Sequence, residues 1–79
     1  MYYVYALKSI KDESLYIGYS SNLKLRLKEH FDGLVTATKD RRPLKLVYYE
    51  CGLSKEKAIL REKSLKTGFG RNYLKNRIA

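Results

Sequence analysis

The stretch LYIGYSSNLKLRLKEH, residues 15–30, passes directly from a strand pattern to a helix pattern. In its first part Leu15 and Ile17 alternate with other side chains, as in a β-strand with one buried face. From residue 22 to 31, leucines and a phenylalanine recur every four positions, which indicates a helix that turns one apolar stripe toward a core. A strand that leads into a helix predicts a fold of the α+β class.

The residues before and after this stretch supply its partners. The run YYVYALKS, residues 2–9, has apolar or aromatic side chains at both parities, which predicts a strand covered on both faces. With residues 15–20 it forms a predicted β-hairpin across the turn IKDES. Ser20 and Ser21 are candidate N-caps of the helix, and Gly33 is its natural end.

The second half of the chain adds a strand and two helices. Residues 33–43 are basic and lack a clear period, which predicts a mobile loop, and PLKLVYYECG, residues 43–52, predicts a third strand. Ser54 caps a predicted helix over residues 55–68, Gly68 and Gly70 break it, and residues 71–78 predict a short closing helix. The order ββαβαα, without repeat or linker, predicts one α+β domain over residues 1–79.

The composition limits the class of function. Seventeen Lys and Arg against eight Asp and Glu give a formal charge of +9, which attracts nucleic acid or an anionic membrane surface. Cys51 is the single cysteine, so the chain holds neither a disulfide framework nor a cysteine zinc site of its own. No apolar run spans a bilayer and RNYLKNRIA is too short and weakly apolar to lie on one, so we expect a cytoplasmic protein without membrane binding.

A carboxylate interrupts the apolar face of the helix over residues 55–68. Three apolar residues of this helix, Ala58, Ile59 and Leu65, lie on one narrow arc. Glu62 falls at the centre of that arc, where burial is costly unless the carboxylate is paired or bound to a metal. An ion pair with Arg26 or Lys66 is the common explanation. The alternative is a ligand for a hard divalent cation, since Mg²⁺ often takes only one or two protein carboxylates.

Polar side chains gather near the hairpin. Tyr5 and Tyr16 have the parity to reach one face of it, if the register allows. Asn22, Arg26 and His30 form one helical stripe at i, i+4 and i+8, while the leucines take the neighbouring arc toward the core. Singly, each has an ordinary explanation: a structural tyrosine, a solvated arginine, an exposed or capping histidine.

Together these residues resemble the GIY-YIG endonuclease domain family, most closely its small stand-alone bacterial members. The resemblance rests on VYAL with Tyr5, YIG from Tyr16, the segment RLKEH with Arg26 and His30, RPLKLVYYE, and Glu62 in AILREKSLK. It covers nearly the whole chain, in order. The first motif reads YVY and lacks the glycine of the family name, but it keeps the tyrosine.

The resemblance implies a three-stranded antiparallel sheet flanked by about three helices, and hydrolysis of DNA phosphodiester bonds with one Mg²⁺ or Mn²⁺. It implies five catalytic residues: Tyr5, Tyr16, Arg26, His30 and Glu62, the last as the metal ligand. Either tyrosine is a candidate general base. A further polar residue of the family corresponds to Asn72 or Asn76.

Nucleic-acid contacts are expected from one amide and eight basic side chains: Asn22, Lys39, Arg41, Arg42, Lys63, Lys66, Arg71, Lys75 and Arg77. No sequence-reading element accompanies them, which favours a structure-directed substrate such as a branch, flap or nick, as in repair or recombination. The sequence leaves DNA and RNA open. It also leaves two rival functions, a non-catalytic nucleic-acid-binding module and a nuclease subunit whose larger protein partner supplies specificity.

Overall fold

A computed structural model describes residues 1–78 of the protein. Its strands form one antiparallel sheet, β1 (Tyr2–Ser9), β2 (Leu15–Ser20) and β3 (Leu44–Leu53). The strand order is β2-β1-β3, so β1 is central and the hairpin partner β2 is an edge strand. This confirms the expected three-stranded sheet and the hairpin.

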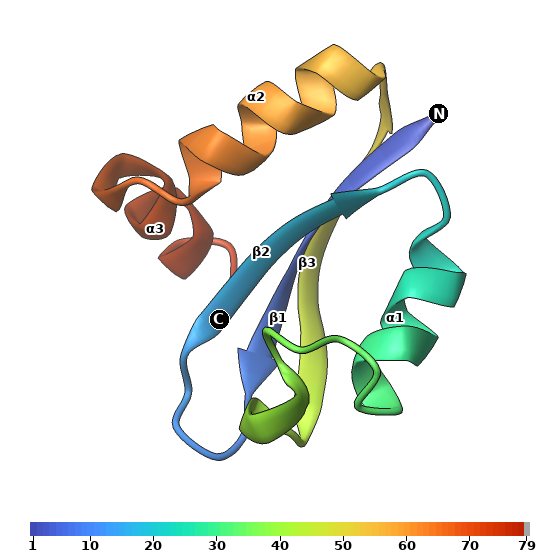
Figure 1. Ribbon diagram of the computed structural model, residues 1–79. Helices are drawn as coiled ribbons and strands as arrows, with labels where there is room; N and C mark the ends of the chain where they lie inside the picture. Colours follow the sequence, from blue (N-terminus) through green and yellow to red (C-terminus); the bar gives the residue numbers. More distant parts are fainter. Residues whose placement is uncertain (79) are drawn as a thin grey trace.

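Three helices and one short turn of helix complete the fold (Figure 1): α1 (Leu23–Phe31), η1 (Lys39–Arg41, a 3₁₀ turn), α2 (Lys55–Leu65) and α3 (Gly68–Lys75). Helix α1 lies on one side of the sheet, and α2 and α3 lie on the other. The order ββαβαα is therefore confirmed. Within residues 1–78, no helix has the length and apolar content needed to cross a membrane.

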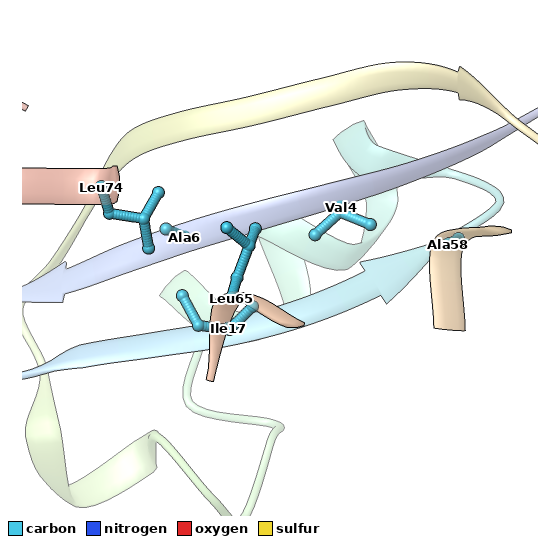
Figure 2. Close-up of a cluster of buried hydrophobic side chains, with 6 residues drawn as sticks. All are labelled: Val4, Ala6, Ile17, Ala58, Leu65 and Leu74. Atoms are coloured by element: carbon cyan, nitrogen blue, oxygen red, sulfur yellow. The ribbon is translucent and has the colours of Figure 1, made fainter. Parts of the chain in front are cut away.

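The main apolar core lies between the sheet and the pair α2 and α3 (Figure 2). It joins side chains of two strands to side chains of two helices, Val4, Ala6, Ile17, Ala58, Leu65 and Leu74. Along the central strand, residues 4–7 are all buried, as the two apolar parities of YYVYALKS predicted. On the other face of β1, Tyr5 points to α1 and contacts His30.

Two predicted helix boundaries are wrong. Asn22 caps α1, since its Oδ1 accepts the backbone N–H of Leu25 at 3.1 Å, so neither Ser20 nor Ser21 is the N-cap. Helix α2 ends at Leu65, and α3 already begins at Gly68 after the cap Thr67.

Gly70 therefore lies inside α3 instead of breaking the preceding helix. A Cβ at Gly70 would lie 2.3 Å from the carbonyl oxygen of Ser64. The glycine is needed because the two helices approach closely there.

Residues 33–43 form a loop, as expected, but the loop contains the turn η1 and is held against the sheet by several contacts. Val35 is buried and Thr38 has no exposed surface. Ser9 Oγ donates a hydrogen bond to the carbonyl oxygen of Arg41 at 2.7 Å, and the Ile10 N–H donates to that of Pro43 at 2.9 Å. These contacts could not be predicted from the basic sequence, because they are made by backbone groups and small side chains.

Candidate active site

The two motif tyrosines lie on the same face of the hairpin, the face toward α1. Tyr5 is paired with Gly18 and Tyr16 with Leu7, so both side chains leave the sheet on the same side, as their parity predicted. The ring of Tyr5 crosses over Gly18, where an added Cβ would lie 2.6 Å from the tyrosine hydroxyl. Tyr5 can therefore take this position only because residue 18 is a glycine.

His30, in the last turn of α1, is fully buried beneath these tyrosines. Its Nε2 lies 2.8 Å from the Tyr5 hydroxyl, and its Nδ1 lies 2.8 Å from Oγ1 of Thr38. The ring also meets Tyr16 edge-on, with 5.2 Å between centroids. Both ring nitrogens therefore have partners inside the protein.

The inner face of α1 agrees only in part with the expected one. Leu23 and Leu27 of the leucine stripe are half-buried, but Phe31 is 44% exposed and His30 is the one fully buried residue of the helix. The cause is the opposing sheet face, which presents tyrosine hydroxyls and so favours polar partners. The polar stripe of α1 is its inner face at this end.

Burial sets the protonation of this cluster. Burial lowers the pKa of His30, and the positive charge of Arg26 lowers it further. Burial raises the pKa of Tyr5 to about 12, although Arg26 acts against this shift. At neutral pH His30 is therefore neutral and Tyr5 keeps its proton.

Arg26 connects the cluster to solvent. Its charge acts on both Tyr5 and His30, while Nη1 donates to Oε1 of Glu29 at 3.1 Å. The Arg26 side chain is 38% exposed. A guanidinium in this position can hold the cluster in place and still offer N–H groups to an incoming anion.

Glu62 lies in α2, on the side of the sheet opposite α1. Its side chain is only 17% exposed, and its Oε1 lies 3.5 Å from Nζ of Lys66. Of the two ion-pair partners considered from the sequence, Lys66 is the one observed, whereas Arg26 pairs with Glu29. The Glu62 carboxylate also adds, after larger effects of burial and Tyr16, to the raised pKa of Tyr5. Glu62 and Tyr5 are thus within electrostatic reach of each other.

A groove of about 580 Å³ runs beside the edge strand β2, with Tyr16 in its wall. Four of the basic residues expected to contact nucleic acid line it: Arg41, Lys66, Arg71 and Lys75. Arg41 is also held by the Ser14 hydroxyl. These cations come from three separate segments, and the groove is the place where the fold gathers them.

The other expected contact residues lie outside this groove. Lys39 and Lys63 are exposed, and Asn22 caps α1. The Arg42 guanidinium lies against Gly33, and that of Arg77 lies over the ring of Tyr73, 3.6 Å from its centroid. Asn72 and Asn76 are both exposed on or at the end of α3, so the structure does not choose between them.

Two features were missed from the sequence. Thr38 gave no signal, because a threonine in a basic loop is ordinary, yet it is the second partner of His30. Glu50 and Arg61 form a bidentate ion pair between β3 and α2, with distances of 2.8 to 3.0 Å, next to Tyr48 and Tyr73. This pair ties down the helix that carries Glu62.

Glu62 is the candidate metal ligand. Among residues 1–78, no group of three or more His, Cys, Asp or Glu side chains lies close enough to hold a metal ion. A shielded carboxylate with a single, longer ion pair fits a Mg²⁺ that takes its remaining ligands from water and from a phosphate. It does not fit a closed site made of protein ligands alone.

The three-stranded sheet, the pair Tyr5 and Tyr16, and Arg26 and His30 of α1 together indicate a nuclease family. A family model, the GIY-YIG catalytic domain, matches residues 1–76, and the chain belongs to this family. Membership implies an endonuclease with DNA as its substrate.

The relatives are small proteins. The chain is similar to a UPF0213 protein of Clostridium perfringens, 48% identical over 84% of this chain and 71% of the relative. It is also similar to a UPF0213 protein of Staphylococcus haemolyticus, 46% identical over 84% of this chain and 80% of the relative. The solution NMR structure of a UPF0213 protein from Bacillus halodurans matches with a TM-score of 0.58 and 34% identity, covering 96% of this chain and 84% of that chain.

Proposed function

We propose that this protein is a metal-dependent endonuclease that hydrolyses DNA phosphodiester bonds at branches, flaps or nicks, in repair or recombination in the cytoplasm. The observation that carries the proposal is the convergence of Tyr5, Tyr16 and His30 from two strands and a helix, with Arg26 beside them. A positive groove adjoins this cluster.

Arg26 is the proposed phosphate clamp. It is the residue of the cluster that has both solvent access and only hydrogen-bond donors. Charge on the non-bridging oxygens is greatest in the transition state, so a fixed guanidinium stabilises that state more than the bound DNA.

Tyr16 is the proposed general base. Tyr5 is 1% exposed, hydrogen-bonded to His30 and shifted to a pKa of about 12, so at neutral pH it keeps its own proton and is shielded from the water that a base must deprotonate. Tyr16 is only half-buried and lines the groove, so a water molecule there can reach its hydroxyl. Tyr5 and His30, the buried members of the cluster, then hold Tyr16 and Arg26 in position.

Glu62 is the proposed ligand of one Mg²⁺ or Mn²⁺, shared with the DNA. The ion would polarise a phosphoryl oxygen and stabilise the leaving oxygen. The chain's own part is to keep the Glu62 carboxylate shielded and oriented, which the neighbouring Arg61–Glu50 pair supports by fixing α2 to β3.

The basic groove supports a substrate chosen by shape. Lys66, Arg71 and Lys75 are suited to phosphate oxygens, which carry no sequence information. Binding should therefore weaken steeply with salt.

The test is a cleavage panel of supercoiled, nicked, flap and branched DNA in Mg²⁺, Mn²⁺ and EDTA. Glu62→Gln should abolish cleavage and leave DNA binding, measured by fluorescence anisotropy, within about threefold, because a neutral amide is a weak metal ligand. Glu56→Gln is the matched control, since Glu56 is an exposed carboxylate of the same helix.

Two results would contradict the proposal. One is cleavage by Glu62→Gln at the rate of the unmodified protein. The other is salt-sensitive DNA binding without turnover in any metal, which would leave a non-catalytic binding module.

A further inference from the structure

Thr38 ends a chain of polar groups that begins at the protein surface. The charge of Arg26 acts on Tyr5, the Tyr5 hydroxyl lies 2.8 Å from Nε2 of His30, and Nδ1 of His30 lies 2.8 Å from Oγ1 of Thr38. Tyr5, His30 and Thr38 are each at most 1% exposed. Water therefore does not compete for these hydrogen bonds.

The fold directs the Thr38 side chain to this use. Thr38 is the N-cap residue of η1, a position where a threonine hydroxyl usually bonds to a backbone N–H of the helix. Here the side chain makes no such cap hydrogen bond. Its backbone groups are used within the loop instead, with the N–H donating to Val35 and the carbonyl accepting from Arg41. These bonds fix the hydroxyl at His30.

Arg26, at the outer end of this series of polar groups, determines the direction in which each hydrogen bond is donated. The positive charge of Arg26 acts on the Tyr5 hydroxyl, so the positive end of that O–H bond turns away from the guanidinium. That hydrogen then points to Nε2 of His30. A neutral imidazole has one donor and one acceptor, so when Nε2 accepts, Nδ1 must carry the hydrogen and donate it to Thr38.

We propose that Thr38 is a positioning residue of the nuclease site, which holds His30 in the Nδ1–H tautomer so that Nε2 receives the Tyr5 hydroxyl and the Tyr5 oxygen faces Arg26. The inference rests on the proposed function for its kinetic part. Thr38 does not touch the substrate. It acts through His30 and Tyr5 on the clamp Arg26.

His30 must adopt its less common neutral tautomer. In water a neutral histidine favours the hydrogen on Nε2, whereas these hydrogen bonds require it on Nδ1. The tautomer of an imidazole is set by the hydrogen bonds of its two nitrogens, so removal of the Thr38 acceptor should return the hydrogen to Nε2. His30 is the one histidine of the sequence, so its ¹⁵N signals need no assignment against other histidines.

The experiment records long-range ¹H–¹⁵N spectra of the intact protein at neutral pH, together with kcat and KM for cleavage. The unmodified protein should show Nδ1 protonated and Nε2 free. Thr38→Val, which keeps the shape and removes the acceptor, should shift the population toward Nε2–H. It should lower kcat about tenfold, the effect of one neutral hydrogen bond, with KM within about twofold. Thr38→Ser restores the hydroxyl and should restore both the tautomer and kcat.

The outcomes separate the two proposals. An Nε2–H tautomer in the unmodified protein overturns the role of Thr38, even if Thr38→Val fails to fold. An unchanged tautomer in a folded Thr38→Val protein overturns it as well. Absence of cleavage by every form of the protein contradicts the proposed function, whereas the role of Thr38 in fixing His30 is decided by the spectra.

Discussion

Gly18→Ala should displace Tyr5 and thereby disable the site. The added Cβ would lie 2.6 Å from the Tyr5 hydroxyl oxygen and 2.7 Å from its Cζ. Since such atoms rest at about 3.5 Å, the end of the ring must retreat by about 1 Å. The Tyr5–His30 hydrogen bond, 2.8 Å long, does not tolerate a displacement of this size at the hydroxyl.

The expected effect on stability is moderate, and the effect on cleavage is large. Overpacking of a well-packed site costs about 1 to 3 kcal/mol, which lowers the Tm of a domain of this size by about 5 to 20 °C. A misplacement of about 1 Å near the reacting groups costs about a hundredfold in rate. Thermal unfolding followed by circular dichroism and a plasmid-nicking assay measure the two effects.

Two other glycines provide matched controls for the same substitution. Gly68 has no atom within 4 Å of its added Cβ, so Gly68→Ala should leave both stability and cleavage unchanged. Gly70→Ala places its Cβ 2.4 Å from Cα of Leu65, in the contact between α2 and α3 and not against the Tyr5 ring, and should destabilise the protein without a specific loss of cleavage below its Tm. The reasoning is refuted if Gly18→Ala unfolds and cleaves like Gly68→Ala.

Three further predictions concern charge. His30 has a lowered pKa in the folded state, so below about pH 6.5 the unfolded chain binds a proton that the folded one does not, and stability should fall as pH falls through this range; urea unfolding should show this slope, and His30→Gln should lack it. Glu50→Gln leaves the Arg61 guanidinium partly buried without its carboxylate and should cost about 1 to 3 kcal/mol in chemical denaturation, whereas Glu13→Gln, whose side chain is 81% exposed, should change stability by less than about 0.5 kcal/mol. Lys75→Ala should reduce the salt slope of DNA binding by about one, and Lys57→Ala, outside the groove, should not; equal slopes would exclude the groove as the DNA contact.

Local periodicity predicted most of the fold. The continuous apolar run YYVYALKS and the alternation in LYIGYS gave the correct strands. Parity alone placed Tyr5 and Tyr16 on one face, because the side-chain period of a strand is two. The ends of helices were harder to predict. Ser20, Ser21 and Asn22 are all good caps, and the choice depends on where the chain leaves the sheet, which neighbouring residues alone do not determine.

Gly70 illustrates a second reason for error. In the sequence it is a helix breaker, but in the fold it is the contact that lets α3 approach α2. Whether a glycine serves backbone freedom or close packing depends on an element that lies elsewhere in the chain, so a local pattern cannot distinguish them.

Thr38 and Glu62 show which parts of a site leave a trace in the sequence. Glu62 was noticeable because it violates the pattern of its own helix, where an apolar residue is expected at the centre of the arc. Thr38 violates nothing, since a small polar residue suits a loop, and its importance comes only from a partner eight residues away that is itself buried. A buried carboxylate such as Glu62 breaks the local pattern of its helix, whereas a residue that only orients another side chain can satisfy every local rule. Positioning residues of this kind are therefore found from the hydrogen-bond partners of the buried polar groups, as Thr38 was found from His30.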